Sequence, residues 1–397
     1  MNILIWDNPE HREDLMPFTF IRPIGEIRIG ILKVSDKWRK AFPENTISYL
    51  AHDYLQVKYK PEFGTDNLYI NGIVCPNPEL NEAISQLQHE QTLVFEDVII
   101  ATRSSKVYKT PEEVEIKEKV EFSPKEAPTL LRHKWDIFLQ NGKEIEADFP
   151  IVTAGRQTQH IRDPHTVIYG QGNIFIEEGA QIKASIINAE DGPVYIGKNA
   201  LIREGCILHG PIAICEGVQI NMGAKIREDC TFGPYCKIGG EIGNSVFFGY
   251  SNKVHEGYVG NTVVGKWCNF GADSNTSNLK NNYGNVKVWN YKSDSLELSD
   301  QLFCGTMMGD YARCGINTML NTGTVVGVCA NIFGAGFPPK HVPPFAWGGF
   351  ENSEVAELDK MYQVAERVKS RRNSSFTDAD KEIFTHVFEL SKKYHQA

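Results

Sequence analysis

A six-residue repeat dominates the middle of this chain. From residue 196 to residue 242 an apolar residue recurs at every sixth position, and a small or apolar residue follows each one four positions later. An α-helix repeats near 3.6 residues and an amphipathic strand near 2, so neither explains this period. The repeat predicts a parallel β-helix, in which each hexad forms one short strand and a turn. The repeated apolar residues are Ile196, Ile202, Leu208, Ile214, Ile220, Ile226, Phe232 and Ile238.

The repeat returns twice further along the chain. It resumes after a two-residue slip, and again after a polar excursion from Asn278 to Asp300. Loops that leave a regular solenoid often carry binding residues, so the excursion is a candidate for ligand contacts. We place the β-helix domain at residues 151–340. The further positions that we expect to point inward are Val246, Asn252, Tyr258, Val264, Phe270, Leu302, Met308, Cys314, Leu320, Val326 and Ile332.

Residues 1–150 have a different pattern, in which strands alternate with helical segments. The expected strands are Asn2–Trp6, Leu68–Ile70, Leu93–Phe95 and Val98–Ala101, and helices are expected at Asn81–Gln91 and Leu130–Leu139, the latter followed by a turn at Asn141–Gly142. This alternation predicts an α/β domain with a mainly parallel sheet. Ligands of such sheets bind outside the carboxyl ends of the strands. Asp7, Asn71 and Gly72 therefore lie near the expected crevice.

Basic residues gather directly after the first strand. Arg12, Arg22, Arg28, Lys33 and Lys37 fall within 26 residues. Guanidinium groups bind phosphate oxygens bidentately, and a lysine acts as a point charge, so the cluster suits a nucleoside triphosphate or a sugar phosphate. The alternative is a solvated helix face that carries the last three of these residues.

Composition and charge exclude several other classes of protein. The net charge of −9, without a basic stripe, argues against a nucleic-acid partner. No apolar run reaches the ~18 residues needed to span a bilayer, and the first residues lack a signal-peptide pattern, so no membrane association is expected. The nine cysteines form no CxxC pair. We expect free thiols and a cytoplasmic protein, with no metal site assigned.

His255 is a candidate general base. It lies three residues before an expected inward position, so a turn is predicted there. A histidine side chain ordinarily titrates near pH ~6.5 and accepts a proton from an amine that attacks a thioester. The alternative is a structural or surface role, the default for any one of eleven histidines. The amide-rich loop from Trp267 to Gly284 suits a hydroxylated sugar ring, although an asparagine-rich turn is the other interpretation.

Residues 341–397 follow the β-helix as an extended segment and two helices. Ser353 is the expected N-cap of the first helix. Thr377 and Asp380 form a near capping box for the second. We expect the helices to pack on the β-helix as a lid or a subunit contact.

These features together resemble a known enzyme family. The hexads behind an α/β domain, the segment from His255 to Asn261 and the segment from Asn269 to Ala272 are similar to the bifunctional N-acetylglucosamine-1-phosphate uridylyltransferase/glucosamine-1-phosphate acetyltransferase family. The closest resemblance is to a variant branch from Bacteroidetes-type bacteria, and it covers nearly the whole chain. It implies a left-handed β-helix, a homotrimer with the acetyl site between subunits, and the substrates UTP, N-acetylglucosamine 1-phosphate and acetyl-CoA, with Mg2+.

The resemblance also assigns roles to individual residues. His255 matches the acetyl-transfer base, with Tyr258 and Asn269 beside it in contact with the sugar. Arg227, Asn278 and Lys280 are assigned to the sugar phosphate, and Gly305, Thr306 and Gly323 to acetyl-CoA. In the N-terminal domain the nucleotide and its phosphates are assigned to Asp7, Arg12, Arg22, Glu26, Arg28, Lys33, Asn71 and Gly72.

The chain departs from the usual family at three places. No GxGTRM loop follows its first strand, its N-terminal domain is shorter, and Leu279–Lys280 stands where Tyr-Asp is expected. The nucleotide base and the sugar therefore stay open. Two other readings also stay open: a nucleotidyltransferase of another sugar, such as a glucose-1-phosphate thymidylyltransferase, whose β-helix is a trimerising scaffold, and a non-catalytic module that binds a sugar nucleotide.

Overall fold

The computed structural model describes residues 1–349 and 353–395. Its internal contacts divide the chain into two units. The first contains Met1–Ile27, Leu32–His133 and Thr377–Val387, and the second contains Arg28–Ile31, Lys134–Phe376 and Phe388–Ala397. Residues 350–352, 396 and 397 of the predicted C-terminal segment lie outside the described residues.

The first unit is built on one six-stranded sheet of order β4-β1-β5-β7-β6-β8. Strands β4, β1 and β5 are parallel, whereas β7 runs antiparallel to both β5 and β6. Strand β8 is parallel to β6, so five of the six strands run in the same direction and the prediction of a mainly parallel sheet is confirmed. Only β7 is reversed, because it forms a hairpin with β6 through Glu96, which has a left-handed φ of 52°. The strands are β1 Asn2–Trp6, β4 Thr46–Leu50, β5 Asn67–Asn71, β6 Gln91–Phe95, β7 Val98–Ser104 and β8 Glu118–Glu121.

Short helices connect these strands. Helix α4 begins at Pro78 because the Asn77 side chain accepts a hydrogen bond from the backbone N–H of Leu80 at 2.8 Å. It ends at Gln86, before the predicted end at Gln91, because Gln91 already belongs to β6. The other elements of this unit are α1 Pro9–Arg12, η1 Ile24–Glu26, β3 Leu32–Lys33, α2 Val34–Ala41, α3 Asp53–Gln56 and η2 Pro111–Glu113.

The second unit begins with two helices, α5 Asp136–Leu139 and α6 Asn141–Thr153. The predicted turn at Asn141–Gly142 was wrong, since Asn141 starts α6 and is fixed by its side chain, which accepts from the Thr231 hydroxyl and donates to the Asp229 carbonyl. Of the predicted helix Leu130–Leu139, only α5 forms. Residue 150 lies inside α6, and the chain divides between His133 and Lys134.

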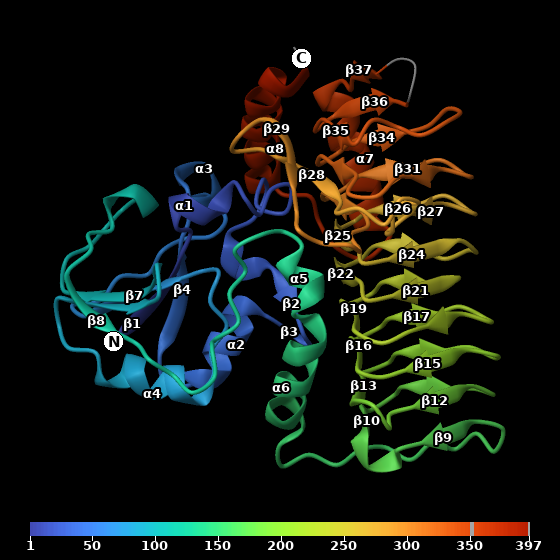
Figure 1. Ribbon diagram of the computed structural model, residues 1–397, viewed down its shortest axis with the longest axis horizontal. Helices are drawn as coiled ribbons and strands as arrows, with labels where there is room; N and C mark the ends of the chain where they lie inside the picture. Colours follow the sequence, from blue (N-terminus) through green and yellow to red (C-terminus); the bar gives the residue numbers. More distant parts are fainter. Residues whose placement is uncertain (350–352, 396–397) are drawn as a thin grey trace. The chain divides into compact units, whose positions relative to one another are not determined.

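Three sheets of parallel strands form the β-helix of the second unit (Figure 1). We call them face 1, face 2 and face 3. Face 1 consists of β9 Val167–Tyr169, β12 Ile186–Asn188, β15 Ile207–His209, β18 Lys225–Ile226, β21 Glu241–Gly243 and β24 Tyr258–Gly260. Face 2 consists of β10 Ile174–Ile176, β13 Val194–Ile196, β16 Ile212–Ile214, β19 Cys230–Phe232, β22 Val246–Gly249, β25 Val263–Lys266, β30 Met307–Met308, β33 Val325–Val326 and β35 His341–Val342. Face 3 consists of β11 Gln181–Ile182, β14 Leu201–Ile202, β17 Gln219–Ile220, β20 Lys237–Ile238, β23 Asn252–Lys253, β26 Asn269–Phe270, β31 Arg313–Cys314, β34 Asn331–Ile332, β36 Ala346–Gly348 and the antiparallel β37 Ser353–Val355.

The hexad residues form the core between the three faces. All eight apolar positions from Ile196 to Ile238 are at most 1 % exposed and belong to one apolar cluster. The predicted fold class is thereby confirmed: an α/β domain followed by a left-handed parallel β-helix of hexapeptide repeats and two C-terminal helices.

The register beyond Ile238 differs from the prediction for one stretch. Phe247, Lys253 and Val259 point inward, each one residue after the predicted position, because they pair with Phe232, Ile238 and Ile242. After Ile238 two shortened turns place Ile242 and then Phe247 in the core, four and five residues further on. Another five-residue step, from Val259 to Val264, restores the predicted register. The expected inward position Leu302 was also wrong, since this side chain is 39 % exposed.

The excursion and the C-terminal segment have regular structure of their own. The excursion holds the antiparallel hairpin of β28 Lys287–Asn290 and β29 Ser295–Leu298, and β27 Asn275–Thr276 pairs with β32 Met319–Leu320. The C-terminal helices are α7 Leu358–Ser370 and α8 Asp378–Ser391. Ser353 is not the N-cap of α7, because it lies in β37. The capping box of α8 is confirmed by reciprocal bonds between Thr377 and Asp380 at 3.0 and 3.2 Å. The remaining short elements are β2 Arg28–Ile29, η3 Gln171–Asn173 and η4 Lys392–His395.

Two predictions about bulk properties can also be compared with the described residues. All nine cysteines are free and buried, as expected. No helix in residues 1–349 and 353–395 is both long enough and apolar enough to cross a membrane.

Candidate functional sites

Asp7 is the central buried charge of the first unit. It follows β1 directly and is fully buried. Its Oδ1 accepts a hydrogen bond from the Ile24 N–H at 2.7 Å, while Oδ2 has no hydrogen-bond partner among the described residues. Burial raises the pKa of Asp7 to about 7, although the Arg12 guanidinium and the N–H groups of Ile24 and His52 oppose this shift. Asp7 is therefore poised between its charged and neutral forms near neutral pH.

Arg12 connects Asp7 to the segment that follows α1. Its Nε lies 3.8 Å from Asp7 Oδ2, and its Nη2 donates to the Thr19 carbonyl at 2.6 Å and to the Tyr54 hydroxyl at 2.5 Å. The Tyr54 hydroxyl donates in turn to the Phe20 carbonyl. The structure thus brings Asp7 and Arg12 together, as the expected crevice requires.

The other predicted phosphate ligands of the first unit have structural partners. Asn71 donates to the Ile99 carbonyl, and a Cβ on Gly72 would lie 2.9 Å from that of Ile24. Glu26 accepts from Lys33 at 2.8 Å and from Tyr49 at 2.6 Å. Arg22 is 3 % exposed and lies two residues before Ile24. Asp7, Arg12, Arg22 and Asn71 are all buried.

Arg28 belongs to the second unit and is described with it. Its Nη1 donates to the Ile31 carbonyl and lies 3.5 Å from the Cys215 sulfur. The spacing along the sequence had suggested one basic cluster, but the chain passes into the second unit after Ile27, and Arg28 makes its contacts there.

In the second unit, His255 lies at the corner between β23 and β24 with its side chain exposed. The next corner residue, Gly257, has φ of 114°, and a Cβ there would lie 2.2 Å from the Ser274 carbonyl oxygen, so the turn requires glycine. No described residue hydrogen-bonds the His255 imidazole.

Lys253 holds the His255 corner from inside the β-helix. Its side chain is fully buried, and its Nζ donates to the carbonyls of His255 at 2.5 Å and Glu256 at 2.7 Å. Burial lowers the pKa of Lys253 to about 8. Sequence reasoning missed this lysine because the one-residue register shift had placed it on the outside.

The Lys253 pKa gives a testable pH dependence. Below pH 8 the lysine is charged in both the folded and the unfolded state, and the cost of burying the charge is fully present. Between about 8 and its ordinary value of 10.5, only the unfolded state keeps the proton, so the stability of the wild type rises with pH. Urea unfolding at several pH values should show the wild type gaining stability relative to Lys253→Met in this window. A constant difference between the two proteins would contradict the assignment.

A polar cluster stands next to the corner on face 1. The Asn278 amide donates to the Tyr258 hydroxyl at 3.0 Å and to the Asn261 side chain at 2.7 Å, while Asn275 accepts from the Tyr258 N–H. Burial raises the pKa of Tyr258, and the nearby charge of Arg227 and the bond from Asn278 oppose the shift. The structure thus groups Tyr258, Asn278 and Arg227. A sugar phosphate could bind Arg227 here, since that side chain is 56 % exposed.

Asn269 lies on face 3 and is not part of this cluster. Its Oδ1 accepts from the Asn252 amide at 3.3 Å, and on the strand it pairs with Asn252 and Arg313. Within one chain, the predicted sugar contacts therefore occupy two faces that meet at the His255 corner.

The predicted acetyl-CoA residues lie next to each other in two successive coils, Gly305 and Thr306 before β30 and Gly323 before β33. The Gly323 N–H donates to the Gly305 carbonyl at 2.9 Å, and the Thr306 N–H donates to the Thr262 hydroxyl. A Cβ on Gly305 would lie 2.1 Å from the Gly260 carbonyl oxygen, so close packing accounts for that glycine. Lys280 is elsewhere, beside a hollow of about 530 Å³ that Lys340 also lines.

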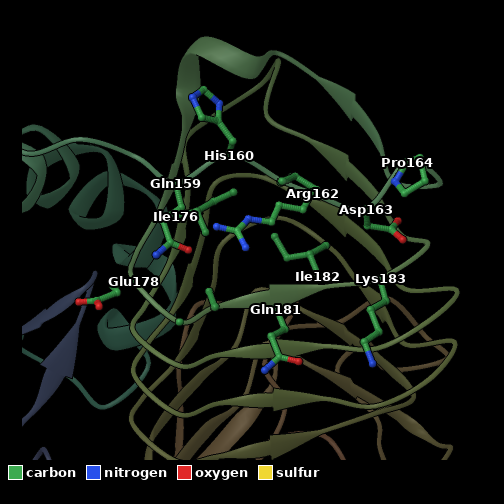
Figure 2. A pocket seen from close by; sticks show the side chains of 13 residues that line it. Gln159, His160, Arg162, Asp163, Pro164, Ile176, Glu178, Gln181, Ile182 and Lys183 are labelled. Atoms are coloured by element: carbon green, nitrogen blue, oxygen red, sulfur yellow. The ribbon is translucent and has the colours of Figure 1, made fainter.

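Another hollow, of about 670 Å³, lies at the first coil of the β-helix. Figure 2 shows the Arg162 side chain lying across this end, above Ile182. A solenoid needs such a cap, because its core would otherwise meet water. None of the predicted site residues lines it, so we assign it to capping.

The described residues contain no group of three or more histidine, cysteine, aspartate or glutamate side chains that could hold a metal ion. Mg2+ in phosphate chemistry is often held by one or two carboxylates together with the substrate phosphates. Asp7, with its unpartnered Oδ2, fits that requirement in the first unit.

The comparisons with known proteins bear on both units. Residues 3–157 match the family described as sugar nucleotidyl transferase. A bifunctional sugar-1-phosphate nucleotidylyltransferase/acetyltransferase from Sulfurisphaera tokodaii is 30 % identical over 169 residues, which is 42 % of this chain and 40 % of that protein. The bifunctional protein GlmU of Methanocaldococcus jannaschii is 36 % identical over 87 residues, or 22 % and 21 % of the two chains. The resemblance stated from the sequence is confirmed.

These matches are partial. The chain spans about two fifths or less of the length of the curated relatives it matches. Among solved structures, the polySia-specific acetyltransferase NeuO aligns with 53 % of this chain and 95 % of its own, at 13 % identity and a TM-score of 0.29. That score is too low to support any conclusion about this chain.

Proposed function

We propose that the chain is a two-site transferase of nucleotide-sugar synthesis, because residues 3–157 match the sugar nucleotidyl transferase family. The first unit joins a nucleoside triphosphate to a sugar 1-phosphate and releases pyrophosphate. The β-helix transfers an acetyl group from acetyl-CoA to an amino-sugar phosphate. The expected substrates are UTP, glucosamine 1-phosphate and N-acetylglucosamine 1-phosphate.

The observation that carries the nucleotidyl proposal is the buried pair of Asp7 and Arg12 at the carboxyl end of β1, within the matched segment. Arg12 and Arg22 bind phosphate oxygens and stabilise the charge of the transition state while the sugar phosphate attacks in line. Mg2+, when bound with Asp7 and the substrate phosphates, would supply further charge neutralisation.

In the β-helix, His255 accepts the proton of the substrate amine as its nitrogen attacks the thioester carbonyl. The carbon–sulfur bond then breaks, and the released thiolate takes up a proton. Tyr258, Asn278 and Arg227 orient the sugar phosphate on face 1. Lys253 acts indirectly, since it fixes the backbone carbonyls of the corner that carries His255.

We propose that the active form is a homotrimer in the cytoplasm. An exposed apolar ladder on face 1, formed by Val167, Ile186 and Ile207, is 39–46 % exposed and supports burial against another copy. The nine free cysteines support a reducing compartment. Sedimentation equilibrium of wild type and Ile186→Lys tests the trimer, because a charge in that ladder should dissociate it.

Pyrophosphate release by the purified protein tests the nucleotidyl site. The assay uses Mg2+ with UTP, dTTP, GTP or CTP and a panel of sugar 1-phosphates, and a parallel assay follows thiol release from acetyl-CoA with glucosamine 1-phosphate. Release of pyrophosphate with UTP and N-acetylglucosamine 1-phosphate is the expected result. If neither pyrophosphate nor free thiol is released, a non-catalytic module that binds a sugar nucleotide is favoured. If only pyrophosphate is released, the β-helix is favoured as a scaffold.

A further inference from the structure

A second polar hollow, of about 430 Å³, lies between face 3 and the C-terminal end of α7. Four cationic side chains line it, namely Lys237 and Arg313 from the strands and Arg371 and Arg372 from the end of the helix. No carboxylate lines it among the described residues. The hollow is therefore positively charged, although the net charge of the protein is −9.

The four cations have few partners of their own. In residues 1–349 and 353–395 none of them forms a salt bridge, and the Arg313 Nε is buried without a hydrogen-bond partner. Arg372 donates to the Asn252 side chain at 3.1 Å. Burial lowers the pKa of both Lys237 and Arg313, and for Lys237 the charges of Arg372 and Arg371 lower it further. Like charges held together at partial burial cost free energy, which a bound anion would offset.

One wall of the hollow is aromatic. Tyr250 and Trp267 line it and stack on each other, with ring centroids 4.2 Å apart. Figure 1 shows α7 beside the strands of face 3, and the bond from Arg372 to Asn252 ties the end of the helix to that face. The hollow therefore offers a flat apolar wall next to several guanidinium groups, and its volume is within the ~300–1,000 Å³ typical of small-molecule sites.

We propose that this hollow binds the diphosphate group of a nucleotide or of a coenzyme. Two or three guanidinium groups bind diphosphate oxygens bidentately, and Lys237 adds a point charge. The aromatic wall then packs against the organic part of the ligand. The proposal concerns binding only and does not rest on either transferase activity, so it is tested without turnover.

Isothermal titration calorimetry of the full-length protein with pyrophosphate tests the proposal. Wild type is compared with Arg313→Gln and with the double variant Arg371→Gln/Arg372→Gln. Loss of a charge-assisted hydrogen bond should weaken binding by roughly tenfold or more in each case. The salt dependence of binding should also fall in the variants, since fewer ionic contacts remain. Arg22→Gln, measured beside them, reports any pyrophosphate bound in the first unit.

The matched control is Arg367→Gln, which removes the same charge from an exposed position of α7 that does not line the hollow. It should bind pyrophosphate like the wild type. Arg371→Lys/Arg372→Lys keeps the charge and should bind with intermediate affinity, which separates ligand binding from a folding defect. Equal affinities of wild type, Arg313→Gln and the double Gln variant, or no pyrophosphate binding by the wild type, would overturn the proposal.

Further titrations identify the source of the diphosphate. If coenzyme A binds more tightly than ADP or UDP, and the double Gln variant weakens this binding, the hollow is assigned to the coenzyme. Similar affinities for ADP, UDP and pyrophosphate, all lost in that variant, would assign it to nucleotides or their product. Each of these results supports a diphosphate site. If the double Gln variant binds all of these ligands as tightly as the wild type, the proposal is contradicted.

Discussion

His255→Ala is expected to lower the rate of acetyl transfer from acetyl-CoA to glucosamine 1-phosphate by about 10²- to 10⁴-fold, the usual contribution of a general base. The imidazole is exposed at the corner between β23 and β24, so its removal leaves the core of the β-helix intact. Pyrophosphate release by the first unit and the oligomeric state should not change. Thiol release from acetyl-CoA at saturating substrate measures the effect.

The matched control for this variant is His209→Ala. His209 lies on β15 of the same β-helix, and its side chain is 37 % exposed and pairs with Asp191 at 3.1 Å. Its replacement should leave acetyl transfer within about twofold of the wild type, because surface substitutions away from a site usually have little effect. If His255→Ala retains full activity, or if both activities fall together, the assignment of His255 as the base is wrong.

The β-helix could be predicted from the sequence because its period has no competing explanation. Each hexad places one apolar residue in the core, and the prediction succeeded at every position from Ile196 to Ile238. It failed after Ile238 because the length of a turn is not encoded in the repeat itself. Two turns shorter than a hexad, which lead from Ile238 to Ile242 and to Phe247, placed Lys253 in the interior and not at the expected surface position. Buried lysines are rare, so the hexad pattern gave no reason to place Lys253 in the core.

The first unit was harder to predict, since the strand pattern gives no direction. Leu93–Phe95 and Val98–Ala101 were both recognised as strands, yet they pair as an antiparallel hairpin. The candidate site shows the same limit. Asp7 and Arg12 follow β1 closely and do meet, whereas Arg28 is close to Arg22 in sequence and belongs to the other unit. Proximity along the chain does not predict a shared site where the chain passes from one unit to the other, as it does after Ile27.

Arg12→Met is expected to reduce the free energy of unfolding by about 3–5 kcal/mol, the usual cost of removing one partner of a buried ion pair. The variant leaves Asp7 fully buried beside an apolar side chain, and it removes the bonds to the Thr19 carbonyl and the Tyr54 hydroxyl. Methionine keeps most of the side-chain volume, so the loss reports charge and hydrogen bonding more than a cavity. Urea unfolding followed by a signal from the first unit measures the change.

Arg132→Met provides the matched control, because Arg132 belongs to the same unit but pairs with Asp97 at the surface, where that carboxylate is 73 % exposed. Exposed pairs contribute about 0–1 kcal/mol, so this variant should be nearly neutral. The double variant Asp7→Asn/Arg12→Met should recover part of the loss, since no unpaired charge then remains buried. Equal effects of Arg12→Met and Arg132→Met would contradict a buried pair. Partial recovery by the double variant, the expected result, would show that burying the unpaired Asp7 carboxylate costs free energy. It would also show that Arg12 keeps this carboxylate charged for phosphate chemistry.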